Sequence, residues 1–182
     1  SAPPYIPCAY LGKAHKRIIW DIAWVTVADG MGVFASVSRD GSVKIWSIAP
    51  NAMGSEEKLC TLEILATLTP FADTAVTAVD VTETVVPSLN PGTGWMLAFG
   101  AESGSIQIWF LSEERLKQTA ACGSSGSEMC SVVHSVSTEQ CHGAAVRRLR
   151  WCAFDQLVGE AAGWKLASGG DDHCVRVFAV TP

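Results

Sequence analysis

Short runs of apolar and β-branched residues, separated by small polar turns, recur along this chain. The run "VFASVS" (33–38) leads into a turn at Asp40-Gly41, and the run "SVKIW" then ends on Trp46. An Asp-Gly pair between two such runs is typical of a tight β-hairpin. The pattern therefore predicts a strand, a turn and a second strand over residues 33–46.

The same hairpin pattern occurs twice more. "MLAFGA" (96–101) precedes a turn that leads to Trp109, and "KLASGG" (165–170) precedes one that leads to Phe178. Each hairpin also follows a further apolar run, namely "IIWDIAW" (18–24), "AVTAVDV" (75–81) and "VRRLRW" (146–151). A fixed order of strand, loop, strand, turn and strand that recurs in one chain indicates a repeat architecture.

A fourth strand is predicted after two of the three hairpins, at 58–68 and 130–137, but not after the third. Upstream, "YIPCAYLG" (5–12) has the pattern of an outer strand from a preceding repeat. We therefore expect one partial domain whose last repeat lacks its outer strand. The domain is expected to span residues 1–182. Its first repeat is expected at 15–68, its second, degenerate repeat at 75–137 and its third at 142–180.

Helix signals are weak by comparison. "SEERLKQTAA" (112–121) predicts one or two helical turns, and the Gly/Ser-rich stretch 122–128 predicts a loop. A second loop is predicted at 87–94, where Pro and Gly recur. These insertions account for a repeat spacing that exceeds the ~40–45 residues of a minimal propeller blade.

Two of the repeats share a set of polar positions. The set in the first repeat is His15, Ser36, Asp40 and Trp46. The set in the third repeat is His142, Ser168 and Asp172, with Phe178 in place of Trp. The second repeat keeps Trp109 but has Ala72, Phe99 and Ser103 at the other positions.

These positions can form one hydrogen-bonded network. A turn carboxylate accepts from an imidazole, the imidazole faces a hydroxyl, and the hydroxyl meets an indole N–H, so that each buried polar group has a partner. Phe178 has no N–H to donate, so the third network is expected to end at Ser168 or on a water molecule.

The pattern resembles the WD40 repeat family, in which such a His, Ser/Thr, Asp and Trp form a structural tetrad. The resemblance implies an all-β fold, a propeller segment of about three four-stranded antiparallel blades within a larger seven-bladed propeller. Blades cannot bury both faces alone, so we also expect exposed apolar faces at both ends of the segment.

Within that family, residues 14–24, 75–81, 96–109 and 165–178 are similar to the WD-repeat subunits of the Elongator complex, and Arg17-Ile18-Ile19-Trp20-Asp21 is the most specific piece. The resemblance implies a non-catalytic scaffold that holds the large scaffold subunit and the catalytic acetyltransferase/radical-SAM subunit together. That complex modifies wobble uridines of tRNA, and its cofactors belong to the catalytic partner, so none is expected here. The alternative is a WD-repeat adaptor of another assembly, such as a ubiquitin ligase or a signalling complex.

Composition narrows the class of protein. The chain has 182 residues, 48% hydrophobic and 17% charged, with a net charge of −5 at pH 7, which excludes a mostly disordered chain and a protein that coats nucleic acid. Its 7 cysteines include no Cys-x-x-Cys pair, so reduced thiols in the cytoplasm, with the nucleus as a further site, fit best. No apolar run approaches the ~20 residues of a membrane span. The chain does not start with Met, and we expect a fragment of a longer protein.

Catalytic and metal-binding motifs are not expected. The pairs Cys141-His142 and His173-Cys174 lack the short-spaced ligand pairs of a structural zinc site. Asp171, beside Asp172 on a turn, has no evident role in acid/base catalysis, since neighbouring turn residues point in different directions. Neither a metal, a small-molecule substrate nor a catalytic residue is predicted.

Basic and aromatic residues offer the candidate interaction surface for a protein partner or, weakly, for RNA. The candidates are Lys16, Arg17, Trp20, Arg147, Arg148 and Arg150. A solvated face with ion pairs is the plain alternative, and an Arg stacked on Trp20 or Trp151 is a third possibility. Direct contact with tRNA is expected to be weak or absent.

Overall fold

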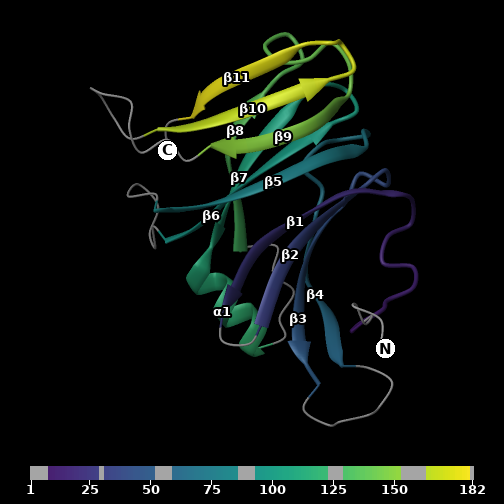
Figure 1. The fold of residues 1–182 in the computed structure, drawn as a ribbon, viewed down its shortest axis with the longest axis vertical. Helices are drawn as coiled ribbons and strands as arrows, with labels where there is room; N and C mark the ends of the chain where they lie inside the picture. The colour runs from purple at the N-terminus through teal and green to yellow at the C-terminus, as the bar shows by residue number, and fades with distance from the viewer. Residues whose placement is uncertain are drawn as a thin grey trace, which may run out of the picture.

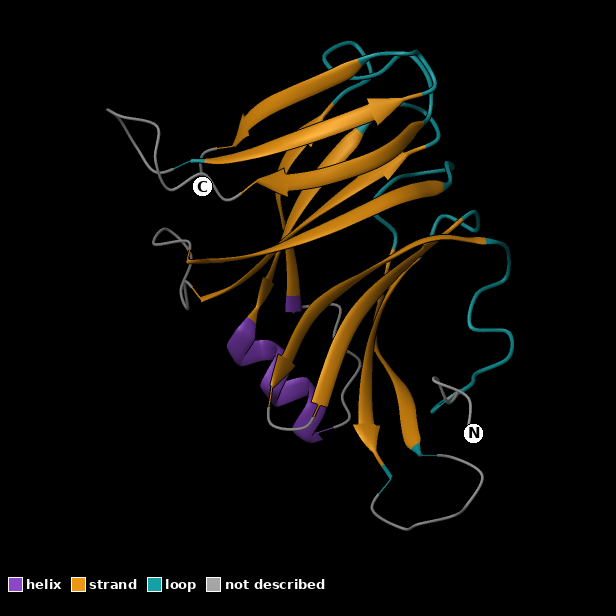
Figure 2. Cartoon of the chain, in the orientation of Figure 1, coloured by secondary structure: helices purple, strands orange, loops and turns teal. Residues whose placement is uncertain are grey.

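Three antiparallel sheets and one helix make up the structure, a computed structural model that describes residues 8–28, 31–51, 59–85, 93–122, 129–152 and 163–180. The sheets stand side by side in chain order, from the purple first sheet to the yellow third one (Figure 1). Strands dominate the chain (Figure 2). The predicted all-β architecture of a partial propeller is confirmed.

Each sheet is a meander in which consecutive strands are neighbours. The first sheet contains β1 (Ile19–Ala28), β2 (Met31–Ser38), β3 (Val43–Pro50) and β4 (Cys60–Leu68). The second contains β5 (Val76–Val85), β6 (Thr93–Ala101), β7 (Ile106–Ser112) and β8 (Cys130–Val136). The third contains β9 (Val146–Cys152), β10 (Trp164–Gly170) and β11 (Val175–Val180).

Burial explains why the central strands read as continuous apolar runs rather than alternating ones. In β6 every residue after Thr93 is buried, because other strands flank β6 on both edges and other sheets cover both of its faces. By contrast, β8 lies at the outer edge of its sheet and exposes much of its length. The second sheet is therefore the shared centre of the segment.

Two apolar cores join the sheets. The first core packs Val37 and Ile45 of the first sheet against Phe99 of the second. The second core packs Met96 and Ile108 of the second sheet against Leu166 of the third. Because each core contains residues from two sheets, each sheet needs its neighbour to bury one of its apolar faces.

The helix α1 (Glu113–Cys122) is longer than the one or two turns predicted. It begins after Ser112, whose hydroxyl accepts a hydrogen bond from the backbone N–H of Arg115. Such a cap satisfies a donor at the start of the helix, and Glu113 and Glu114 suit its positive end. Leu116 anchors α1 in the first core.

The prediction of a strand at 5–12 is wrong for its described part. Residues 8–12 form no strand, and residues 5–7 lie outside the described residues. The backbone N–H of Cys60 donates to the carbonyl of Cys8 over 2.9 Å, so this segment follows the edge of β4. None of the three sheets in the described part of the chain includes this segment as a strand.

Both end sheets expose an apolar face. On the first sheet Ile22 is 55% and Trp24 59% exposed, and on the third sheet Val175 is 79% and Val177 65% exposed. The corresponding faces of the second sheet are covered by its two neighbours.

The three hairpin turns share one set of backbone hydrogen bonds. Each third turn residue donates to the carbonyl three positions earlier, and the donors are Gly41, Gly104 and His173. All three have positive φ, at 80°, 94° and 61° respectively. Each first turn residue also donates over 2.9 Å to the segment that precedes the first strand of its sheet, in the pairs Arg39 to Ile18, Glu102 to Ala75 and Asp171 to Ala145.

We predict that Gly104→Ala destabilises the chain by about 2–4 kcal/mol, because it combines left-handed backbone with steric overlap. A Cβ on Gly104 would lie 2.0 Å from the carbonyl oxygen of His142 in the next repeat. Urea unfolding followed by tryptophan fluorescence measures the change. Gly41→Ala is the matched control: its Cβ would lie 3.1 Å from the Thr74 carbonyl, so a loss of only about 1–2 kcal/mol is expected. Equal losses at the two sites would contradict this account.

Candidate functional site

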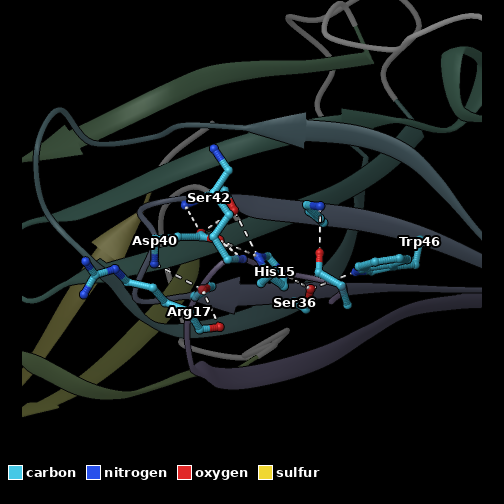
Figure 3. A network of polar contacts seen from close by, with 10 residues as sticks. His15, Arg17, Ser36, Asp40, Ser42 and Trp46 are labelled. Atoms are coloured by element: carbon cyan, nitrogen blue, oxygen red, sulfur yellow. Dashed lines mark hydrogen bonds and ion pairs between the residues drawn. The ribbon is translucent and has the colours of Figure 1, made fainter. Parts of the chain in front are cut away.

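His15 is the centre of a buried polar network in the first sheet (Figure 3). Its Nε2 lies 2.7 Å from the hydroxyl of Ser36, and its Nδ1 lies 3.0 Å from the hydroxyl of Ser42 and 3.4 Å from Asp40 Oδ2. The indole Nε1–H of Trp46 donates to Ser36 Oγ over 2.7 Å. The four residues picked out from the sequence therefore meet in one network, with Ser42 as a fifth member that was not predicted.

The direction of each hydrogen bond in this network follows from its two ends, because the Trp46 indole can only donate and the Asp40 carboxylate can only accept. Because the indole can only donate, Ser36 Oγ accepts from Trp46, and the Ser36 hydroxyl donates its own hydrogen bond to His15 Nε2. His15 Nδ1–H then donates to Ser42 Oγ, and the hydroxyl of Ser42 donates to Asp40. Asp40 also accepts from the backbone N–H of Lys16 over 2.8 Å, which closes the loop before β1 onto the hairpin turn.

The third sheet contains a shorter version of the network. His142 Nδ1 lies 2.7 Å from Asp172 Oδ1, and His142 Nε2 lies 2.7 Å from Ser168 Oγ. Phe178 occupies the position of the indole and packs against the second core. Arg176 adds an ion pair to Asp172 over 2.9 Å, a contact the sequence pattern did not indicate.

The second sheet has no such network, as its sequence predicted. Phe99 fills the serine position and is fully buried. The indole N–H of Trp109 donates instead to Gln107 Oε1 over 2.8 Å. The hydroxyl of Ser103, at the aspartate position, donates to the Ser105 hydroxyl over 3.3 Å. Apolar packing replaces the polar tetrad in this repeat.

The three arginines of β9 all lie beside carboxylates. Arg147 pairs with Asp171 in the turn between β10 and β11 and lies over the ring of Trp20, with 5.8 Å between guanidinium and ring centre. Arg148 lies 4.0 Å from Asp21 and Arg150 3.8 Å from Asp80, and both carboxylates belong to other sheets. Trp20 is 39% exposed. The sequence offered Trp20 and Trp151 as stacking partners for an arginine, and Trp20 is the one that lies beneath Arg147.

The same carboxylates also join neighbouring sheets through the backbone. Asp21 of β1 accepts from the N–H of Val79 in β5 over 3.3 Å, and Asp80 of β5 accepts from the N–H of Trp151 in β9 over 2.6 Å. The first strands of the three sheets are therefore linked in series. This role of Asp21 and Asp80 was not predicted, because strand periodicity does not show which strand a carboxylate will meet.

Lys16 and Arg17 lie elsewhere, at a cleft of about 780 Å³ between the first and second sheets. Arg39, the first residue of the hairpin turn, joins them there. The sequence pattern had placed Arg39 only in a turn. The structure therefore divides the candidate surface into paired arginines on β9 and a separate basic group at this cleft.

No group of three or more metal-ligating side chains is gathered in the described ranges. Among the described helices, none is long and apolar enough to cross a membrane.

Comparison with known protein families gives a direct match. The family described as "WD domain, G-beta repeat" matches residues 7–47 and 133–178. The two matched segments contain the two histidine-centred networks. This chain contains WD40 repeats.

Similar proteins carry one name. The chain is 34% identical over 170 residues to Elongator complex protein 2 of Arabidopsis thaliana, an alignment of 91% of this chain and 17% of that protein. It is 27% identical over 184 residues to the protein of the same name from Dictyostelium discoideum, covering 99% of this chain and 18% of the relative. The Schizosaccharomyces pombe protein is 40% identical over 104 residues, or 57% of this chain and 12% of the relative. The predicted resemblance is confirmed, and the chain spans less than a fifth of the length of these relatives.

Electrostatics keep the WD40 tetrad of the first repeat in one protonation state. Burial lowers the pKa of His15, against the raising influence of Asp40, so the folded chain holds a neutral imidazole. Burial alone would raise the pKa of Asp40, but the hydrogen bonds from Ser42 and from the Lys16 backbone hold it well below its usual range. The pKa of Asp172 is lowered in the same way, against burial, by His142 and Arg176.

We predict that Ser36→Ala destabilises the chain more than Trp46→Phe. The serine substitution leaves the Trp46 N–H and His15 Nε2 without partners in the interior, at about 1–3 kcal/mol for each group. The indole-to-phenyl change removes one donor and some packing, as the natural Phe178 does, and costs about 1–3 kcal/mol in total. Urea unfolding of both variants measures which one loses more stability. A Ser36→Ala variant as stable as the wild type would show that the members of the network do not depend on one another.

We also predict that the free energy of unfolding falls as pH is lowered from 7 to 5. The unfolded chain takes up a proton on His15 near pH 6.5, while the folded chain resists it, so stability is present above that pH and lost below it. A second loss begins below about pH 4, where the unfolded carboxyls of Asp40 and Asp172 bind protons before the folded ones do. Urea midpoints across this pH series measure both. His15→Gln should flatten the first loss, and an unchanged slope would contradict its assignment to His15.

Proposed function

We propose that this chain is part of a non-catalytic scaffold subunit of the Elongator complex. The observation that carries the proposal is the name shared by its relatives, Elongator complex protein 2, over 91–99% of the chain in the two longest alignments given above. In this role it contacts the large scaffold subunit and the catalytic acetyltransferase/radical-SAM subunit. The complex as a whole modifies wobble uridines of tRNA.

The physical properties of the segment suit a scaffold. The loops before the first strands and the hairpin turns are tied together by backbone hydrogen bonds in all three repeats. In two repeats a buried histidine network adds to them. Loops held on a rigid frame can present side chains to several partners without a large loss of conformational entropy on binding.

The subunit is proposed to act in the cytoplasm, with the nucleus as a second location. The described cysteines form no disulfide, and burial raises the pKa of the Cys130 thiol to about 12, as for an unreactive core thiol. Reduced cysteines of this kind fit a compartment that keeps thiols reduced.

Direct tRNA binding by β9 is a weak candidate. Each of its three arginines lies beside a carboxylate, in pairs with Asp171, Asp21 and Asp80. A phosphate backbone would have to displace those carboxylates, and the chain has a net charge of −5. We therefore propose that tRNA is contacted at most indirectly.

Affinity purification of the full-length protein from its own cells tests the scaffold proposal. We expect a tagged form to recover the large scaffold subunit and the radical-SAM subunit, identified by mass spectrometry. Recovery of ubiquitin-ligase or signalling components without any Elongator subunit would reject the proposal in favour of the adaptor alternative. A Gly104→Ala form serves as a control in which the segment is destabilised but its surface chemistry is unchanged.

A further inference from the structure

Three cations at one edge of the segment have no acidic partner among the described residues. Lys16, Arg17 and Arg39 are exposed and take part in none of its ion pairs. Four other described arginines pair with carboxylates, namely Arg147, Arg148, Arg150 and Arg176. Lys13, Lys44 and Lys165 also take part in no ion pair among the described residues, but Lys16, Arg17 and Arg39 are set apart because they gather at one cleft.

The three residues line the cleft of about 780 Å³ between the first and second sheets. Its volume lies within the ~300–1,000 Å³ typical of ligand sites. The cations belong to the wall formed by the first sheet, and half-buried Phe71 offers apolar contact surface. Asp73 and Glu102 line the wall formed by the second sheet. Asp40 also lines the basic wall, where its carboxylate accepts from the Lys16 backbone N–H. Three cations and one carboxylate therefore face two carboxylates across the cleft, and the basic wall keeps an excess of positive charge.

The backbone beneath the cations is held in place. Lys16 donates its N–H to Asp40 Oδ2 over 2.8 Å, and Arg39 donates its N–H to the carbonyl of Ile18 over 2.9 Å. The carbonyl of Arg17 accepts from the Ser38 hydroxyl over 3.4 Å. Figure 3 shows the Arg17 side chain extending away from the tetrad that supports this loop. A fixed backbone lowers the entropy lost when such side chains bind a ligand.

The fold does not require cations at these places, as the third repeat shows. There Gly143 donates its N–H to Asp172 Oδ2, as Lys16 does to Asp40. Asp171 takes the place of Arg39 and makes the same backbone bond, to Ala145. The same local structure thus forms with a glycine and an acid, so the basic side chains of the first repeat need an explanation other than folding.

We propose that this cleft binds an acidic segment of a partner protein, with carboxylates on Arg17, Arg39 and Lys16 and an apolar side chain near Phe71. Guanidinium groups match carboxylates in charge and geometry. The inference rests on the proposed scaffold function and names the chemistry of one of its contacts.

An RNA strand fits the cleft less well. A phosphate backbone repeats its charge along its length and favours an extended basic track. Here the basic wall faces Asp73 and Glu102, and the nearby arginines of β9 already lie beside carboxylates. A short acidic peptide can place its carboxylates on one wall and avoid the other.

Fluorescence anisotropy of the full-length protein tests the proposal. The probes are a labelled octapeptide of glutamate and leucine (EELEELEE), its glutamine counterpart QQLQQLQQ and a single-stranded RNA octamer. We expect binding of the acidic peptide only, weakened at least tenfold in the double variant Arg17→Glu, Arg39→Glu. Arg115→Glu, which changes an exposed arginine on α1 outside the cleft, should change the affinity less than twofold. Unchanged thermal midpoints establish that the variants are folded, and Arg17→Gln with Arg39→Gln gives a milder pair.

Three results would overturn the inference. They are equal affinity of the wild type and the double variant for the acidic peptide, no binding of that peptide, and preferential binding of RNA. The assay needs no other subunit. If affinity purification recovers Elongator but the peptide result is negative, the cleft proposal fails and the scaffold proposal stands. If the peptide result is positive but purification recovers another assembly, the cleft retains its chemistry and the assembly was assigned wrongly.

Discussion

A buried histidine that joins a loop to a hairpin is the interaction on which the first and third repeats depend. His15 and His142 each have no exposed side-chain surface and link a serine on the middle strand to the aspartate of the turn. An imidazole suits this place because one neutral ring both donates and accepts. The network fixes the loop before the first strand against the turn, and that fixed pair of loops forms the edge at which Lys16, Arg17 and Arg39 gather.

The second repeat shows which part of this arrangement is indispensable. It has lost the histidine network, yet Glu102 still donates to Ala75 as its counterparts do in the other repeats. Cores on both of its faces, with Phe99 in one and Met96 in the other, compensate for the missing polar contacts. The repeats at the ends of the segment have one covered face each and keep their histidine networks. Polar networks in the end repeats and apolar packing in the middle repeat thus both stabilise the arrangement of strands and loops within a repeat.

Charge is used in two distinct ways on this surface. Along the first strands, Asp21 and Asp80 accept backbone N–H groups of the next sheet and also lie close to Arg148 and Arg150. These contacts hold sheets together and leave little free charge. At the cleft the cations are unpaired and their backbone is rigid, which is the arrangement expected of a recognition surface rather than a structural one.

The sequence by itself determined the local structure, because its signals are local. The runs of apolar and β-branched residues, the Asp40-Gly41 turn and the recurrence of His15 and His142 identified the strands, the hairpins and the members of both histidine networks. Only the tertiary structure decided the rest. That Arg148 meets Asp21, that Trp20 lies beneath Arg147 and that Arg39 joins Lys16 and Arg17 depends on how separate sheets and loops approach one another. No periodicity encodes these approaches, since they are set by side-chain packing between the sheets and by backbone bonds between residues far apart in the chain.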